Sequence, residues 1–272
     1  MKRRRDALRV AVVLLLFLVV IAGVDSRLKT VTYEIVSDEV ESPVTLAVLA
    51  DLHGCSYGEG QRELLDAVSK VQPDAVLMLG DIVDDVMPEK NAWTTVSALS
   101  EEYPCYYVTG NHEWWSGEVE RICADMAVTG VNVLQGDCKS IGVNGNTITF
   151  CGVDDPDSDV YESQLKRVCD QITEEGFHVL LAHRPERIEE YLECPFDLIL
   201  SGHAHGGQWR LPGIVNGLYA PHQGLFPKYA GGRYDFEDAV FVVSRGLARE
   251  STKIPRMFNR PELVVTHLVP VG

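Results

Sequence analysis

Polar clusters whose side chains can bind metal ions follow five apolar segments of this sequence. The clusters are Asp51-Leu52-His53, Gly80-Asp81-Ile82-Val83-Asp84, Gly110-Asn111-His112-Glu113, the single His183, and Gly202-His203-Ala204-His205. Carboxylates, imidazoles and a carboxamide, without a thiolate, favour divalent Mn, Fe or Zn over Cu(I) or an iron–sulfur cluster. One Asp-x-His or His-x-His pair arises often by chance. Five clusters in this order indicate a shared metal centre.

The apolar segments before the clusters are expected to be strands of an α/β domain. The strands are predicted at residues 44–50, 74–79, 105–109, 177–182 and 197–200. Apolar residues at helical spacing between some of these segments predict helices that separate the strands. In open α/β sheets the carboxyl ends of the strands form the ligand crevice. The clusters should therefore converge, although the outermost ligands lie 154 positions apart. Shorter strand-like runs between residues 131 and 152 suggest a second sheet, and two late strands are predicted at 239–244 and 263–268.

The ordered motifs resemble the calcineurin-like metallophosphoesterase superfamily, and in particular its membrane-associated bacterial branch typified by the YkuE and YaeI phosphoesterases. The likeness spans about residues 44–269 and includes Gly-His-Ala-His-Gly-Gly-Gln-Trp-Arg-Leu-Pro at 202–212 and Phe-Asn-Arg-Pro-Glu at 258–262. Ser244-Arg245-Gly246-Leu247 also matches, whereas Ala248 stands where glycine is usual. The resemblance implies a four-layer α/β/β/α sandwich of two mixed sheets flanked by helices.

The same resemblance implies a site for two divalent metal ions. One ion would take Asp51, His53, Asp81 and His205, and the other would take Asp81, Asn111, His183 and His203. The chemistry of the side chains agrees with this division. A carboxylate such as Asp81 can bridge two cations through its two oxygens, whereas an imidazole cannot. The neutral carbonyl of Asn111 would leave the second ion electrophilic.

Such a centre predicts hydrolysis of phosphate esters or anhydrides by a metal-bridging hydroxide, without a covalent intermediate. His112 is the expected general acid for the leaving oxygen, and Asp84 is the expected partner that orients it and keeps it protonated. Arg245 could clamp a substrate phosphate, although an ion pair is an equal alternative in an acidic protein. Gly207, with Gly206, is expected to let the backbone pass close to the metals and the substrate.

The remaining histidines and the tryptophans near the motifs have weaker cases. His178, His222 and His267 lie outside the clusters, so structural or solvent-exposed roles are favoured over ligation. Three tryptophans flank the motifs at positions 114, 115 and 209, where core packing is favoured over lining a pocket.

The first 24 residues read as a membrane-targeting segment. A basic region at 1–9 precedes an uninterrupted apolar run at 10–24. We expect a retained transmembrane signal anchor with its basic end in the cytoplasm and the catalytic domain outside. A cleaved signal peptide, or a twin-arginine export signal at Arg4-Arg5, remains an alternative. Residues 25–43 are expected to be a connector, and 44–272 a single metallophosphoesterase domain.

Charge restricts the partners of this chain. The formal net charge is -16, and from Asp25 onward 19 basic residues face 39 acidic ones. Tight nucleic-acid binding is therefore not expected, and a nuclease is disfavoured. A phosphate-containing small molecule or lipid is the expected substrate, and the resemblance implies lipid-linked or cell-envelope phosphates such as a UDP-diacylglucosamine-type pyrophosphate. A non-catalytic scaffold of the same fold that binds a membrane partner is the alternative.

Seven cysteines without a CxxC pair predict neither a zinc ribbon nor a thioredoxin-type site. Buried, reduced cysteines are favoured over a disulfide framework. One or two bridges stay open if the domain is exported.

Overall fold

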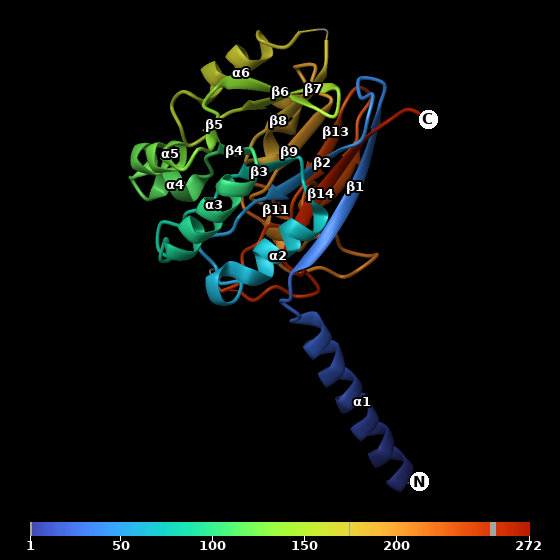
Figure 1. The fold of residues 1–272 in the computed structure, drawn as a ribbon. Coiled ribbons are helices and arrows are strands. Elements are labelled where there is room, and N and C mark those ends of the chain that lie inside the picture. The colour runs from blue at the N-terminus through green and yellow to red at the C-terminus, as the bar shows by residue number, and fades with distance from the viewer. Residues whose placement is uncertain (1, 174, 251–253) are drawn as a thin grey trace.

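Two six-stranded mixed sheets stack face to face and carry helices on both outer faces (Figure 1). The computed structural model of the chain describes residues 2–173, 175–250 and 254–272. The side chains of Lys2, Arg3 and Arg4, on which the expected basic region depends, lie outside the described part of the structure. The two sheets and the helices are those expected for an α/β protein with a second sheet.

The first sheet is parallel except where β14 meets β2. Its order is β1 (Lys29–Ser37), β14 (Glu262–Pro270), β2 (Val44–Leu49), β3 (Ala75–Leu79), β4 (Cys105–Val108) and β5 (Asn132–Val133). The second sheet has four parallel central strands and an antiparallel strand at each edge. Its order is β12 (Gly232–Asp235), β13 (Val240–Val243), β9 (Leu198–Ser201), β8 (Phe177–Leu181), β7 (Asn146–Gly152) and β6 (Asp137–Val143). A small hairpin joins β10 (Tyr219–Ala220) to β11 (Gly224–Leu225).

Helices cover the outer face of each sheet. The first sheet carries α2 (Arg62–Val71), α3 (Lys90–Glu102) and α5 (Val119–Val128), and α4 (Asn111–Trp115) follows β4. The second sheet carries α6 (Tyr161–Cys169) and α7 (Ile188–Tyr191). Short 3-10 turns lie at η1 (Glu59–Gln61), η2 (Pro185–Arg187) and η3 (His205–Gly207).

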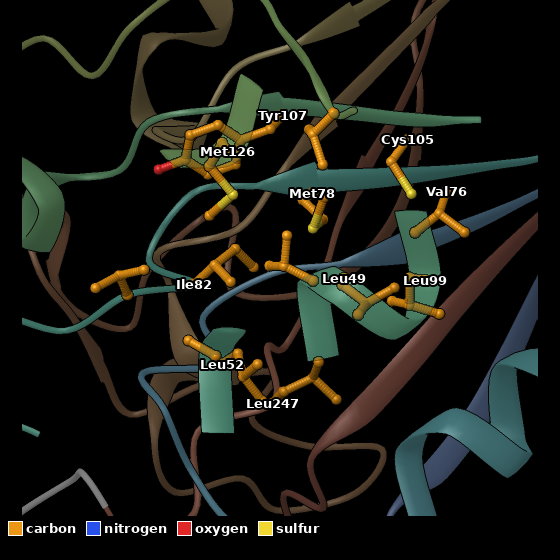
Figure 2. Close-up of a cluster of buried hydrophobic side chains, with 14 of the residues drawn as sticks. Leu49, Leu52, Val76, Met78, Ile82, Leu99, Cys105, Tyr107, Met126 and Leu247 are labelled. Atoms are coloured by element: carbon orange, nitrogen blue, oxygen red, sulfur yellow. The ribbon is translucent and has the colours of Figure 1, made fainter. Parts of the chain in front are cut away.

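The inner strands are buried on both faces, which explains why their sequences are continuously apolar. Along β2, Leu46 and Val48 face the second sheet, whereas Ala47 and Leu49 face the helices. Figure 2 shows the helix-side cluster, in which strand residues such as Leu49 lie near Leu99 of α3. This packing fixes the strand ends that carry the metal-binding motifs.

The segment 25–43, expected to be a connector, contains strand β1. It pairs in parallel with β14 over nine residues, from Lys29 opposite Glu262 to Ser37 opposite Pro270. Most of its side chains are exposed because β1 is an edge strand, and only Ile35 is fully buried. Because residues 29–37 are largely polar, their sequence did not predict that they form a strand of the first sheet.

Two disulfides overturn the expectation that the cysteines are buried and reduced. Cys138 and Cys151 lie directly opposite each other in the β6–β7 hairpin, and Cys169 at the end of α6 is joined to Cys194. Cys55, Cys105 and Cys123 are buried and lie outside these bridges.

The first helix, α1 (Lys2–Gly23), extends away from the folded body (Figure 1). Apolar side chains along it, including Val13 and Phe17, are exposed. Among the described residues, no helix reaches the length and apolar character that crossing a membrane requires.

Candidate metal centre

The ends of five strands bring all seven expected metal ligands to one edge of the two sheets. Each ligand lies within four residues of the strand that precedes it. Asp51 and His53 follow β2, Asp81 follows β3, Asn111 follows β4, His183 follows β8, and His203 and His205 follow β9. Backbone hydrogen bonds join the neighbouring loops, because Asp51 N donates to Gly80 O at 3.1 Å and His53 N donates to Asp81 O at 2.8 Å.

The ligand atoms form two groups around Asp81. Asp51, His53 and His205 offer atoms within 4.8 Å of one another, and so do Asp81, His183 and His203. One oxygen of Asp81, Oδ2, lies 3.7 Å from His53 Nε2 and 3.2 Å from His183 Nε2. Asp81 therefore lies between the two groups, where its carboxylate could contribute to holding a cation in either one.

Four of these side chains present buried polar atoms without a hydrogen-bond partner in the described part of the chain. They are Asp51 Oδ2, His53 Nε2, Asn111 Oδ1 and His183 Nε2. Buried polar atoms of this kind are rare, and each one without a partner requires an explanation. All four are lone-pair donors that divalent cations accept, so the residues present fit a metal centre.

Hydrogen bonds orient two of the ligand imidazoles. The Nδ1–H of His183 donates to Leu79 O at 2.6 Å, which leaves Nε2 as the lone-pair nitrogen. His53 Nδ1 lies 2.7 Å from Asp84 Oδ2 and presents Nε2 in the same way. Burial acts to lower the pKa of His183, but the charge and contact of Asp81 outweigh it and raise the pKa to about 10. A cation in this place would take over the role of that proton.

The backbone of the centre is strained. Positive φ angles occur at five of the seven ligands: Asp51, His53, Asp81, His203 and His205, with values from 46° to 63°. Such conformations cost on the order of 1–3 kcal/mol each and cluster at functional sites, where they aim side chains. The backbone therefore leaves its usual conformations where five of the seven expected ligands lie.

Glycines make the close approach of the ligand loops possible, but not the two expected from the sequence. A Cβ on Gly110 or Gly246 would collide with Asp81 or Asp51. The expected Gly207 instead packs against Gly217, and Gly206 packs against Asn259. Gly206 and Gly207 therefore shape the turn after β9 that begins at His205.

A buried carboxylate, Glu113, holds two ligand loops together. Its Oε1 accepts hydrogen bonds from Ile82 N at 2.8 Å and Val83 N at 3.0 Å. Its Oε2 accepts from Asp81 N at 2.9 Å and Gly110 N at 2.8 Å. Burial and the charge of Asp81 raise the pKa of Glu113, and the backbone donors of Gly110, Val83 and Asp81 oppose that rise. One side chain thus fixes the loops of both Asp81 and Asn111.

His112 lies at the mouth of the centre, partly exposed, with two carboxylates near Nδ1. Asp85 Oδ1 is 2.6 Å away, and the expected partner Asp84 is 3.3 Å away. Asp84 makes its shorter contact with His53, so it serves a metal ligand as well as His112. Asp85 was not among the expected site residues, because it carries no motif signal beyond following Asp84.

The expected substrate clamp Arg245 is held in an ion pair. Its Nε lies 3.3 Å from the buried carboxylate of Glu262, which is the alternative that the sequence left open. Of the three tryptophans, Trp114 packs on the helix-side core, whereas Trp115 and Trp209 are exposed. The Trp115 ring lies 4.9 Å from the His112 ring, so it borders the mouth of the site.

His222, expected to have only a structural or solvent role, lies against the centre. His222 Nδ1 is 3.0 Å from Nε2 of the expected ligand His203, and Arg184 Nη1 lies 2.7 Å from His222 Nδ1. Arg184 is buried and makes two hydrogen bonds to Asp155, at 2.6 and 2.8 Å. A cavity of about 590 Å³ opens beside Arg184 and His222. By contrast, His178 and His267 lie elsewhere, near Asp197 and Thr45.

A family model described as calcineurin-like phosphoesterase matches residues 44–207. The chain therefore belongs to the calcineurin-like phosphoesterase family, and it is a metal-dependent phosphoesterase with a candidate two-metal site of His and Asp residues.

Curated relatives extend this likeness beyond the matched segment. YpbG of Bacillus subtilis is 27% identical over 90% of this chain and 87% of its own length. The metallophosphoesterase YkuE of the same organism is 26% identical over 79% and 76%. The Campylobacter jejuni metallophosphoesterase Cj0846 is 30% identical over 76% of this chain, a match that spans 59% of the length of Cj0846. Among solved structures, a dimetal phosphatase from Danio rerio covers 75% of this chain and 88% of its own, with 12% identity and a TM-score of 0.49.

Proposed function

We propose that this chain hydrolyses a phosphate ester or anhydride at the centre around Asp81. The observation that carries the proposal is the set of four buried atoms of expected ligands that have no hydrogen-bond partner among the described residues and that come from three separate strand ends, those of β2, β4 and β8. Two divalent ions, Mn, Fe or Zn, would be held by Asp51, His53, Asp81 and His205 on one side and by Asp81, Asn111, His183 and His203 on the other. When bound, the ions would supply positive charge to the phosphate oxygens and activate the attacking water.

The chain's own residues prepare the reaction in two ways. Asp84 and Leu79 O hold the imidazoles of His53 and His183 with Nε2 toward Asp81. His112, flanked by Asp84 and Asp85, would carry the proton that the leaving oxygen takes. Its partial exposure at the mouth lets it reach a substrate, and its Nδ1 contacts leave Nε2 as the donating atom.

We also propose that α1 anchors the chain in a membrane, with the catalytic domain on the outer side. Exposed apolar side chains along α1 support the anchor, and the basic first residues support its orientation. The two disulfides support an oxidising compartment for the domain. A membrane-bound site suits a lipid-linked or cell-envelope phosphate. Carbonate extraction followed by N-terminal sequencing tests retention of α1, and a soluble product that begins near residue 25 would contradict it.

The activity is tested with the purified chain, Mn²⁺ and bis-p-nitrophenyl phosphate. Release of p-nitrophenol that depends on metal and is lost in Asp81→Asn is the expected result. A matched control is Asp235→Asn, because Asp235 is an exposed residue at the edge of the second sheet. A folded, metal-loaded protein that hydrolyses neither phosphodiesters nor phosphomonoesters would instead indicate a non-catalytic scaffold.

A further inference from the structure

Large apolar side chains gather on the loops around the C-terminal end of α1. Six of them, here called the apolar rim, are exposed: Trp209, Leu211, Ile214, Leu225, Phe226 and Ile254. Single exposed apolar residues are normal on a protein surface, whereas a grouped set marks an interaction surface. The metal centre uses none of these six side chains.

Backbone contacts connect the apolar rim to α1. Phe258 N donates to Gly23 O at 2.6 Å, and Gly23 packs so closely on Met257 that a Cβ there would lie 3.2 Å from its side chain. Met257 in turn forms a bridge with Trp209, whose indole N–H donates to Pro255 O at 3.0 Å. Figure 1 shows α1 leaving the body at the end where these loops lie. Leu218 N donates to Trp209 O at 2.8 Å, so the loop of Trp209 and the β10–β11 hairpin adjoin the segment that contacts α1.

Backbone hydrogen bonds order the loops that carry the rim side chains. Leu211 and Val215 exchange hydrogen bonds of 3.0 and 2.8 Å, which forms a turn with Ile214 exposed near its tip. Phe226 N donates to Leu218 O at 2.9 Å, so Leu225 and Phe226 are likewise held outward. Ordered apolar tips on separate loops are suited to insert into a soft surface.

The sequence segment that carries five of the six rim residues differs in charge from the rest of the chain. Residues 198–234 contain no Asp or Glu but three basic residues, Arg210, Lys228 and Arg233. The 39 acids among the 248 residues from Asp25 onward would place about six in a stretch of this length, and such acids would be repelled by an anionic lipid surface. This segment is the part of an otherwise acidic body that suits such a surface.

We propose that the apolar rim lies on the lipid bilayer beside α1 and holds the metal centre at the level of the headgroup phosphates. This inference rests on the membrane anchoring proposed above. The rim segment also carries His222, which contacts the metal ligand His203, so docking of the rim brings the site to the membrane surface. The substrate class that follows is the phosphate ester or anhydride of a membrane lipid.

The test uses the full chain in vesicles of phosphatidylcholine and phosphatidylglycerol, with an environment-sensitive nitrobenzoxadiazole label. Single cysteines are introduced as Ile214→Cys and Phe226→Cys in the rim. Val128→Cys is the matched control, because Val128 is at least as exposed as Ile214 and Phe226 but lies at the end of α5, away from α1 (Figure 1). Unsubstituted chain labelled in parallel measures the background from Cys55, Cys105 and Cys123, which burial keeps low.

Labels at 214 and 226 are expected to shift to shorter wavelength and to be quenched by doxyl groups on the lipid acyl chains. Interfacial side chains lie about 5–10 Å into the boundary between headgroups and acyl chains, within reach of such quenchers. The label at 128 should show neither effect. If the chain floats with the vesicles while labels at 214 and 226 behave like that at 128, the result would support membrane anchoring by α1 and would contradict contact of the rim with the bilayer. A wavelength shift without quenching would indicate a second protein copy and overturn it, and a chain that does not float would overturn both ideas. Phosphoesterase activity on a water-soluble substrate is measured separately, so failure of the rim proposal can be distinguished from failure of the proposed function.

Discussion

Replacement of Glu113 by Gln should weaken both the fold and the metal site. Gln keeps one carbonyl oxygen, so it can satisfy one pair of backbone donors, either Ile82 and Val83 or Asp81 and Gly110. The other pair would face an NH₂ group and remain without acceptors. Each buried donor left without an acceptor costs roughly 1–3 kcal/mol, so two of them would lower the free energy of unfolding by about 2–6 kcal/mol.

The expected loss of unfolding free energy lies in the lower part of that range, because the substitution also removes the unfavourable buried charge of Glu113. Glu113 is buried next to Asp81, and both facts raise its pKa, so a neutral amide removes some repulsion. We therefore expect Glu113→Gln to lower the free energy of unfolding by about 2–3 kcal/mol. Affinity for divalent metal should fall by about 10–100-fold, as is typical when a residue that orients metal ligands is lost.

The assay is urea unfolding of the metal-free chain followed by circular dichroism, together with metal titration of the folded chain. Glu120→Gln is the matched control, because Glu120 is exposed on α5 and such surface changes stay within about 0.5 kcal/mol. If Glu113→Gln unfolded at the same urea concentration as Glu120→Gln and bound metal equally well, the assigned role of this carboxylate would be refuted.

Three further outcomes follow from the structure. His112→Ala should retain metal but lose about 10²–10⁴-fold in turnover on bis-p-nitrophenyl phosphate, and wild-type turnover would remove His112 from the reaction. For Asp84, burial raises the pKa, but the contact with His53 and two backbone donors outweigh it and lower the pKa to about 2. Its stabilisation is therefore present above the unfolded pKa near 4 and is lost as pH falls toward 2. Asp84→Asn should flatten the acid unfolding profile of the metal-free chain between pH 4 and 2, and an unchanged profile would exclude this contribution. Peptide mapping without reductant should recover Cys138 joined to Cys151, and a reduced or differently paired Cys138 would contradict the hairpin register.

The central strands could be predicted because their burial leaves a direct signal. β2 and β3 are covered on both faces, so nearly every position is apolar and the runs end where the ligands begin. Edge strand β1 has no such signal, since solvent covers most of it and its pairing with β14 depends on residues more than 200 positions away. Only the structure shows that β1 pairs with β14 and so belongs to the first sheet.

The candidate metal ligands could be proposed from sequence because each lies next to a strand end within a short motif. His222 and Arg184 carry no comparable pattern. His222 reaches His203 only because the loop around β10 and β11 folds back over the end of β9. Asp85 and Asp84 are adjacent in sequence, so only geometry shows that Asp84 is nearer to His53 and Asp85 is nearer to His112.

The cysteines show the same limit of sequence analysis. Cys138 and Cys151 become partners through hairpin register, and Cys169 meets Cys194 through the packing of α6 beside the chain after α7. An odd cysteine count without recognisable spacing could not distinguish these four from the buried Cys55, Cys105 and Cys123.

The metal content of the folded chain tests the central claim most directly. After purification, removal of metal with a chelator and titration with Mn²⁺ or Zn²⁺, elemental analysis should find two ions per chain, and Asp81→Asn should bind fewer. Circular dichroism confirms that both proteins are folded. A correctly folded wild-type chain that binds fewer than two divalent ions at saturation would contradict the account, because the buried atoms of Asp51, His53, Asn111 and His183 would then have no partner to explain them.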